Sequence, residues 1–441
     1  MYKVLFVSLG CDKNLCDSEA MLGLLSANNY MVTDDENDAD VIVINTCSFI
    51  HDAKEESITT ILSLAELKTE GKLKALIVAG CLAQRYQKEI MEQIPQVDAV
   101  IGTTACGEIV NAVNNALAGN NEIYLEDINR LEIIDSSRAI TPGSYTSYIK
   151  IAEGCNKHCT YCIIPKLRGN FRSVPMERLI KEAQYLAAQG IKELIVVAQE
   201  TTLYGIDLYG EKMLPKLLQE FCKIDGIEWI RVLYCYPEEI TDELIQVIKE
   251  EDKICKYIDM PIQHSSDAIL KRMGRRTTRK MLTDLIEKLR KEIPDIIIRT
   301  TLITGFPNET EEDFEDLLDF VYDNSFDRLG VFTYSAEEDT PAYSFDNQVP
   351  EDVKVERRDA VLQMQQDIAF DSAYEKIGYI FDVLVEGYIP DEEVYVGRTY
   401  MDAPGVDGYI FFKSGKQILS GEFVKVEVTD AKGYDLIGEI I

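Results

Sequence analysis

The run Glu153-Gly154-Cys155-Asn156-Lys157-His158-Cys159-Thr160-Tyr161-Cys162 spaces three cysteines as C-x3-C-x2-C. It directly follows residues 148–152, an apolar segment that predicts a β-strand. Three thiolates on one tight loop can bind three irons of a cubane 4Fe–4S cluster and leave the fourth iron open to a small chelating molecule. The alternatives are buried packing cysteines or a structural zinc loop, although zinc needs four ligands and His158 lies at an awkward spacing. The pattern favours the iron–sulfur cluster.

Apolar and helical segments alternate for almost 200 residues after this loop. Short apolar runs separated by helices are typical of a parallel sheet with helical cover. Six such units predict an incomplete TIM-like (β/α)6 barrel, and its open side would admit a large substrate. The predicted strands are residues 148–152, 193–198, 229–233, 257–260, 296–303 and 328–333, and the predicted helices are residues 177–189, 214–222, 242–250, 280–292 and 311–323.

Three further cysteines, Cys11, Cys47 and Cys81, each follow a short apolar run near the N-terminus. These runs, residues 4–9, 41–45 and 75–79, alternate with helical stretches and predict a doubly wound, flavodoxin-like parallel sheet over residues 1–135. The carboxyl ends of such strands face one crevice, so the three cysteines should converge. They could serve as ligands of a second open-site cluster, or they could simply be small core residues.

The rest of the chain divides into a linker, a long helix and a small terminal domain. Residues 134–146 contain turn formers and predict a linker into the central domain, residues 136–372. A polar helix is expected at residues 351–376. The short strands expected at residues 380–385, 394–399, 409–412 and 423–428 predict an all-β, OB-like barrel over residues 373–441.

The charge is strongly acidic, with 77 Asp and Glu against 45 Lys and Arg and a net charge of −32. One interpretation is that this charge only keeps the protein soluble. The other is that it attracts basic partners and makes nucleic acid an unfavourable main partner. The terminal barrel contains six basic and thirteen acidic residues, a net charge of −7. No apolar run reaches the roughly 18 residues of a membrane span, and the first residues lack a signal-peptide layout, so we expect a cytoplasmic protein.

The loop with Cys155, Cys159 and Cys162 resembles the radical S-adenosylmethionine superfamily, in which S-adenosylmethionine binds the open iron and is cleaved to a 5′-deoxyadenosyl radical. Two three-cysteine sites followed by a β-barrel resemble its methylthiotransferase family over essentially the whole chain, including the terminal TRAM barrel. The resemblance implies two 4Fe–4S clusters, the second held by the N-terminal cysteines and carrying the sulfur that is methylated and inserted. It also implies two uses of S-adenosylmethionine and a flavodoxin or ferredoxin as electron donor.

Three stretches, residues 8–19, 260–264 and 334–342, resemble the subgroup that modifies small-subunit ribosomal protein 12. This implies a methylthio group on the β-carbon of an aspartate, although Asp12 and Cys16 depart from the subgroup's usual residues. A methylthiotransferase acting on transfer RNA adenosine would need a more basic terminal barrel. A radical enzyme without sulfur insertion and a non-catalytic iron–sulfur protein remain alternatives from other classes.

Superfamily members hold S-adenosylmethionine with residues at the ends of later barrel strands, and here the same residues could instead cap turns. A glycine there would permit close approach of the backbone to adenine. The basic run at residues 271–280 could touch ribosomal RNA or the electron donor, but a solvated face before a helix that Thr277 or Thr278 caps is the simpler interpretation. The candidate S-adenosylmethionine contacts are Gln199, Glu200, Gln263, His264, Arg299 and Gly305.

Overall fold

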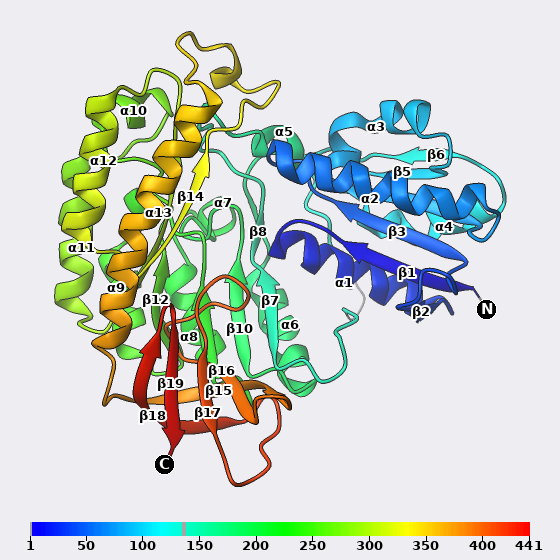
Figure 1. The fold of residues 1–441 in the computed structure, drawn as a ribbon. Helices are drawn as coiled ribbons and strands as arrows, with labels where there is room; N and C mark the ends of the chain where they lie inside the picture. Colours follow the sequence, from blue (N-terminus) through cyan, green and yellow to red (C-terminus); the bar gives the residue numbers. More distant parts are fainter. Residues whose placement is uncertain (1, 135–137) are drawn as a thin grey trace.

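The computed structural model describes residues 2–134 and 138–441 and contains three units, an N-terminal α/β domain, a central partial barrel and a small C-terminal barrel (Figure 1). The predicted boundary between residues 135 and 136 lies outside the described residues. Within the described part of the chain, no helix combines the length and the apolar character needed to cross a membrane.

The N-terminal domain is a six-stranded parallel sheet in the order β2-β1-β3-β4-β5-β6. Its faces form two separate cores, because α1 and α4 cover one face while α2 and α3 cover the other. The doubly wound prediction is confirmed, and the short β2 and β6 are largely exposed strands that no predicted segment covers. The elements are β1 (Lys3–Ser8), α1 (Asp12–Ala27), β2 (Met31–Thr33), β3 (Val41–Thr46), α2 (His51–Thr69), β4 (Ala75–Gly80), α3 (Cys81–Gln93), β5 (Ala99–Ile101), η1 (Cys106–Glu108), α4 (Ile109–Leu117) and β6 (Glu122–Tyr124).

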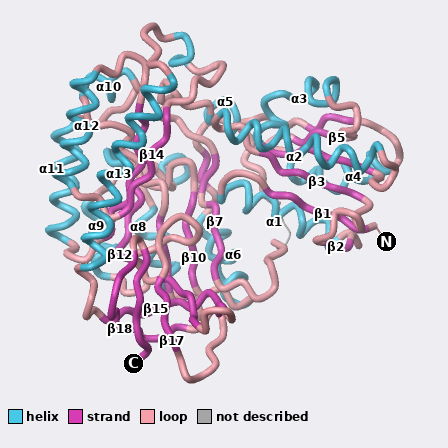
Figure 2. The backbone as a smooth tube through the Cα atoms, in the orientation of Figure 1, coloured by secondary structure: helices cyan, strands magenta, loops and turns pink. Residues whose placement is uncertain are grey.

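The central sheet has six parallel strands in the order β14-β13-β12-β11-β10-β7, and it does not close. Its outer helices bury the largest core of the molecule, and the predicted incomplete barrel is therefore confirmed (Figure 2). The main elements are β7 (Thr146–Lys150), α6 (Met176–Ala188), β10 (Glu193–Val197), α8 (Leu214–Cys222), β11 (Trp229–Val232), α9 (Asp242–Glu250), β12 (Ile254–Asp259), α11 (Arg279–Glu292), β13 (Ile297–Thr304), α12 (Glu311–Asn324), β14 (Arg328–Thr333) and α13 (Glu351–Tyr374). The smaller elements are β8 (Ala152–Glu153), α5 (Ile164–Arg168), β9 (Arg172–Ser173), α7 (Ile206–Tyr209), η2 (Pro237–Glu239), α10 (Asp267–Arg272) and η3 (Pro341–Ser344).

The C-terminal unit is a closed five-stranded barrel in the order β15-β16-β17-β19-β18. The all-β prediction is confirmed, and β19 is the strand that the sequence pattern did not indicate. The strands are β15 (Ile380–Ile389), β16 (Val394–Arg398), β17 (Ile410–Lys413), β18 (Phe423–Lys432) and β19 (Asp435–Ile440).

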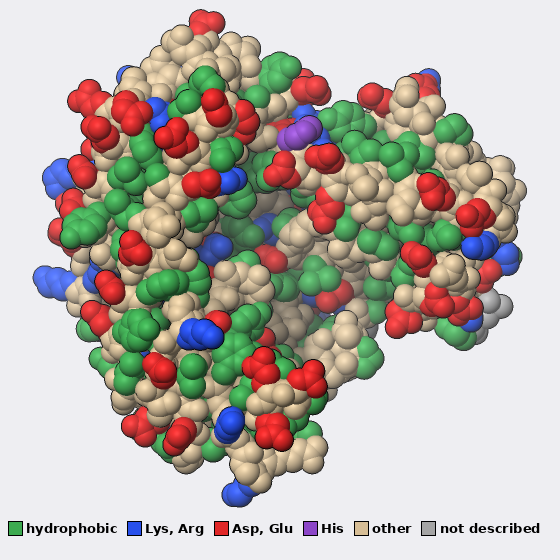
Figure 3. Space-filling model, viewed as in Figure 1, with side chains coloured by type: hydrophobic (Ala, Val, Ile, Leu, Met, Phe, Trp, Pro, Cys, Tyr) green, Lys and Arg blue, Asp and Glu red, His purple; other side chains and the backbone are tan. Residues whose placement is uncertain are grey.

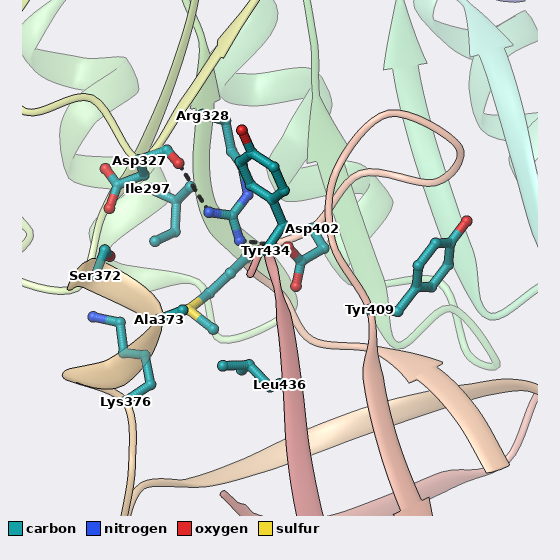
Figure 4. Close-up of a pocket in the computed structure, with 11 residues that line it drawn as sticks. Ile297, Asp327, Arg328, Ser372, Ala373, Lys376, Asp402, Tyr409, Tyr434 and Leu436 are labelled. Carbon is teal, nitrogen blue, oxygen red and sulfur yellow. Dashed lines mark hydrogen bonds and ion pairs between the residues drawn. The ribbon is translucent and has the colours of Figure 1, made fainter. Parts of the chain in front are cut away.

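This small barrel packs against the amino-terminal ends of the central strands. Trp229, which begins β11, meets Phe423 edge to face with ring centroids 4.8 Å apart. Arg328, which begins β14, pairs with Asp402 at 2.6 Å and donates to the backbone oxygen of Asp327 at 2.8 Å. Figure 4 shows this guanidinium between the two units in the pocket that they line. The small barrel does not cover the opposite, carboxyl-terminal ends of these strands.

A second junction ties the N-terminal domain to the segment that follows β14. Glu337 is buried and accepts ion pairs from Lys54 of α2 and Arg85 of α3, both at 2.8 Å. Burial raises the pKa of Glu337, but the two cations outweigh it, so that this pKa lies below its usual value. The N-terminal domain is thus held against the carboxyl-terminal edge of the central sheet.

The innermost contact of the small barrel is a fully buried triad of Glu193, Arg231 and Arg398. Glu193 begins β10 and accepts from Arg231 Nε at 2.9 Å and from Arg398 Nη2 at 2.6 Å. Burial raises the pKa of Glu193, yet the two guanidinium groups outweigh burial and hold this pKa below 4.5. The carboxylate therefore stabilises the fold above pH 4.5, and this contribution disappears as the pH falls through the lowered pKa.

We expect Glu193→Gln to lower the free energy of unfolding by about 3–5 kcal/mol at neutral pH, because it leaves buried Arg231 without a carboxylate and Arg398 with only Glu386. The difference from wild type should shrink when acid titrates Glu193 below pH 4.5. Thermal unfolding followed by circular dichroism across this range measures both effects. Asp382→Asn is the control, since Asp382 and its partner Lys425 are each 60% exposed. Equal melting temperatures for Glu193→Gln and the control would contradict the prediction.

Candidate functional site

The C-x3-C-x2-C loop joins β8 to α5 at the carboxyl-terminal edge of the central sheet. Gly154 has φ 79°, and a Cβ there would lie 2.2 Å from the backbone oxygen of Asn170, so only glycine fits this turn. The Cys155 N–H donates to the Gly169 oxygen at 3.1 Å, and the Cys162 N–H donates to the Cys159 oxygen at 3.0 Å. These bonds fold the loop so that its three thiols face one another.

The thiols of this loop form an electrostatically coupled group. Burial, together with the neighbouring Cys159, raises the pKa of Cys155 to about 11. Burial and the same neighbour also raise the pKa of Cys162 well above its usual value. A bound metal would stabilise the thiolate forms of Cys155 and Cys162.

The donor set suits an iron–sulfur cluster. All eleven cysteines are free thiols. In a cubane each thiolate binds a different iron, so three thiols on one loop can bind three irons. Cys155, Cys159 and Cys162 are thus the residues that would hold a cluster.

The structure brings Cys11, Cys47 and Cys81 together at the carboxyl-terminal edge of the N-terminal sheet. Cys11 immediately precedes α1, Cys47 follows β3, and Cys81 begins α3. Gly10 has φ 87°, and a Cβ there would lie 3.0 Å from Cys47 Sγ. Burial raises the pKa of Cys81 to about 12, with further contributions from Cys47 and Cys11. Their convergence matches the expectation, while their role as ligands stays a prediction.

Arg168 joins the two cysteine sites. It ends α5, six residues after Cys162, and it is almost completely buried. Its guanidinium donates to Asp17 at 2.7 Å and to Glu153 at 3.1 Å, and its Nη2 donates to Asn14 Oδ1. Asp17 and Asn14 belong to α1, so one cation fixes the helix that starts at Cys11 against the loop that contains Cys162.

Asn14 carries this network into the N-terminal site. Its side-chain amide donates to the backbone oxygen of Leu9, which follows β1, at 3.0 Å and to that of Thr46, which ends β3, at 2.9 Å. Its Oδ1 lies 3.9 Å from Cys81 Sγ. The positive charge of Arg168 opposes the rise in the pKa of Cys81 that burial causes. Asn14 and Arg168 therefore position the loops, and the charge of Arg168 favours the thiolate form of Cys81.

The comparisons with known proteins agree with this arrangement. Residues 3–102 match the model described as "Uncharacterized protein family UPF0004", residues 149–321 match the radical SAM superfamily, and residues 377–441 match the TRAM domain. The protein named "Ribosomal protein uS12 methylthiotransferase RimO" of Lachnoclostridium phytofermentans is 59% identical over 99% of each chain. The protein of the same name from Clostridioides difficile is 51% identical over 100% of this chain and 99% of its own length.

The chain belongs to the radical S-adenosylmethionine methylthiotransferase family. Membership implies a 4Fe–4S cluster and S-adenosylmethionine as cofactors. Solved structures share the fold at low identity. The radical S-adenosylmethionine methyltransferase TsrM of Kitasatospora setae has a TM-score of 0.54 at 14% identity, covering 77% of each chain. OxsB, a cobalamin-dependent radical enzyme, has a TM-score of 0.52 at 14% identity, covering 83% of this chain and 56% of its own.

Two candidate cofactor contacts of this methylthiotransferase lie beside the cluster loop. Gln199 accepts from the Gly154 N–H at 2.8 Å and donates to Glu153 at 2.7 Å, which supports the turn before Cys155. Glu200 is buried, and burial raises its pKa to about 7. Its Oε2 makes no hydrogen bond and lies 3.8 Å from Lys157 Nζ. Their contact with S-adenosylmethionine stays a prediction.

The other four candidates are engaged within the protein. His264 is buried with Nε2 3.4 Å from Glu309, and Gln263 exchanges backbone hydrogen bonds with β13. Arg299 pairs with Asp259 at 3.3 Å and lies 3.6 Å from Asp407 of the terminal barrel. Lys354 fills the space beside Gly305, where a Cβ would lie 2.2 Å from its Cγ. Each of these four residues therefore has contacts within the protein, and their cofactor contacts stay predictions.

One interpretation of the sequence is wrong in part. The basic run was expected to be a solvated face, but Arg275 is buried, with its guanidinium 4.4 Å from the ring centroid of Tyr236. The Tyr236 hydroxyl lies 3.9 Å from Cys159 Sγ, so the run contributes a cation to the cluster loop. The predicted helix cap is confirmed, because the Thr278 side chain accepts a hydrogen bond from the Met281 N–H at the start of α11.

We expect Arg168→Met to destabilise the folded protein by about 3–5 kcal/mol, because Asp17 and Glu153 would keep only Lys150 as a cation. The measurement is the melting temperature of the purified full chain. Arg358→Met is the matched control, since Arg358 is on the surface and pairs with its neighbour Asp359. If both variants melt at the wild-type temperature, Arg168 does not hold the two sites together.

Proposed function

We propose that this chain attaches a methylthio group to the β-carbon of an aspartate in small-subunit ribosomal protein uS12. The observation that carries this proposal is the pair of three-cysteine sites joined through Arg168, since sulfur insertion needs a radical source close to a sulfur source. The full-length relatives named uS12 methylthiotransferase support the choice of substrate. Replacing hydrogen on an unactivated carbon lies beyond side-chain acid–base chemistry and requires such cofactors.

We assign a second 4Fe–4S cluster to Cys11, Cys47 and Cys81, beside the one on Cys155, Cys159 and Cys162. When bound, the clusters supply reductive cleavage of S-adenosylmethionine and a carrier for the sulfur. The chain holds each cluster with three thiolates and leaves one iron open. Its buried loops exclude water, and Arg168 and Asn14 fix the distance between the two sites.

The proposed domains follow this division of labour. Residues 1–135 would hold the sulfur-carrying cluster, residues 136–372 would generate the radical, and residues 373–441 would help to bind the substrate. The proposed S-adenosylmethionine contacts are Gln199, Glu200, Gln263, His264, Arg299 and Gly305. Of these, Glu200 and His264 have the strongest support, because Glu200 Oε2 and His264 Nε2 are buried without a hydrogen-bond partner.

The acidic surface supports a basic protein as partner. The chain carries a net charge of −32, and acidic side chains lie over much of the face in Figure 3, including part of the rim of the hollow between the N-terminal domain and the rest of the molecule. Such a field attracts a basic ribosomal protein, free or assembled, and repels the phosphates of nucleic acid. A cytoplasmic location and a flavodoxin or ferredoxin as electron donor are part of the same proposal.

Anaerobically reconstituted enzyme should add one methylthio group to an aspartate of uS12 in a mixture that also contains unmodified transfer RNA. The assay supplies S-adenosylmethionine, sulfide and a reductant, and mass spectrometry identifies the product. An adduct on transfer RNA instead would show that the proposed substrate is wrong, but it would leave the assignment to the methylthiotransferase family unchanged. Formation of 5′-deoxyadenosine without any adduct would contradict the proposal.

Cys47→Ala should abolish methylthiolation while 5′-deoxyadenosine still forms, because the substitution removes a thiolate from only one of the two sites. Iron per chain should fall by about half, as expected for loss of one of two clusters. Cys222→Ala is the control, since Cys222 is half-buried and lies on α8, away from both sites. Loss of radical formation in Cys47→Ala, although about half of the iron remains bound, would contradict the assignment of separate roles.

A further inference from the structure

Lys13 is a buried cation beside the N-terminal cysteine site. It lies in the first turn of α1, two residues after Cys11, and its side chain is only 5% exposed. Cys11 is exposed, whereas Cys47 and Cys81 are buried. A substrate therefore reaches this site on the side of Cys11, where Lys13 also stands.

The position is unfavourable for a lysine that has only a structural role. Burial removes the ammonium from water, and the first turn of a helix carries the positive end of the helix dipole. Among the residues that the structure describes, no carboxylate oxygen lies within 4.0 Å of Lys13 Nζ. The ammonium instead lies 3.1 Å from the ring centroid of Tyr234, which follows β11.

The neighbouring basic residues behave differently. Lys150 pairs with Asp17 and with Glu153, the latter at 2.6 Å, and Arg168 pairs with the same two carboxylates. Lys157 pairs with Glu238 at 3.3 Å and also with Glu239. These three cations have permanent anionic partners in the fold, and Lys13 does not.

The carboxylates nearest to Lys13 have other partners. Asp12 accepts from the Tyr234 hydroxyl at 3.3 Å. Asp259 accepts from the Tyr234 N–H at 3.0 Å and pairs with Arg299. An ammonium has three N–H donors, so Lys13 retains capacity for an anion that the fold itself does not supply.

The substrate of the proposed function brings such an anion. The aspartate β-carbon must come close to the sulfur held at the site of Cys11, and its carboxylate carbon is bonded directly to that β-carbon. Only Asp12 separates Lys13 from Cys11 in the sequence, and Cys11 lies close enough to interact electrostatically with the Lys13 ammonium, so the substrate carboxylate arrives beside the ammonium. A carboxylate that leaves water for this site needs a cationic partner.

We propose that Lys13 binds the side-chain carboxylate of the substrate aspartate and thereby selects aspartate over asparagine at the modified position. The ring of Tyr234 keeps the ammonium in place before the substrate binds. This inference rests on the proposed function and adds to it the residue that recognises the reacting side chain.

The test compares two peptides that contain the target segment of uS12, one with the natural aspartate and one with asparagine in its place. Wild-type enzyme should modify the aspartate peptide at least about 100-fold faster at limiting substrate, because asparagine leaves the buried ammonium without an anion. In Lys13→Met this ratio should fall to near one, and Lys13→Arg should retain most of the preference. Because each ratio is measured within one preparation, incomplete cluster loading affects both peptides equally.

Iron content and 5′-deoxyadenosine formation are measured in parallel, and Lys88→Met serves as the control because Lys88 is an exposed lysine of the same domain. A wild-type preference for aspartate that persists in Lys13→Met would overturn the inference and leave the proposed function standing. Absence of methylthio product on either peptide and on full-length uS12 with wild-type enzyme would overturn the proposed function itself, and the inference with it.

Discussion

The buried guanidinium of Arg168 is the contact on which the arrangement of the two cysteine sites depends. It belongs to the loop region of the central domain, yet two of its partners, Asn14 and Asp17, belong to the helix that starts at Cys11. A planar group with five N–H donors can serve an amide and two carboxylates at once, which a lysine ammonium cannot do in the same geometry. Because these carboxylates would be costly to bury without a cation, separating the domains is unfavourable, and the sites stay adjacent.

This contact works because two parallel sheets present their carboxyl-terminal edges to each other. Parallel strands leave their following loops at one edge, and both cysteine sites are built from such loops. The terminal barrel occupies the other end of the central sheet, where Glu193, Arg231 and Arg398 are buried together. The cysteine loops therefore lie at the carboxyl-terminal ends of the central strands, and the buried ion pairs that stabilise the fold lie at their amino-terminal ends, as in closed α/β barrels.

The sequence predicts the elements that local pattern determines and misses those that depend on distant contacts. Apolar runs before Cys11, Cys47 and Cys81 predict both the sheet and the convergence of the thiols. The strands β2 and β6 are short and largely exposed, so they carry no apolar run. Asn14 and Asp17 follow Cys11 at intervals of three, which places them on one helix face, but nothing local indicates that Arg168 would meet them. The same limit applies to Arg275, because its charge predicts exposure to solvent, while its contact is with Tyr236 in the distant loop that follows β11.

The distribution of charge explains how an acidic chain can host this chemistry. The surface carries the excess of carboxylates, whereas several lysines and arginines lie buried or half-buried around the cysteines, among them Lys13, Lys150, Arg168 and Arg275. Thiolate-bound clusters are anionic, and such cations offset that charge where water cannot. Lys150 and Arg168 are also paired with carboxylates of the fold, so their net effect on the clusters is reduced. Lys13 has no carboxylate partner in the fold, and its charge is therefore available to an anion that enters from outside. The acidic exterior attracts a basic protein, and the buried Lys13 accepts the one acidic side chain of that protein that is modified.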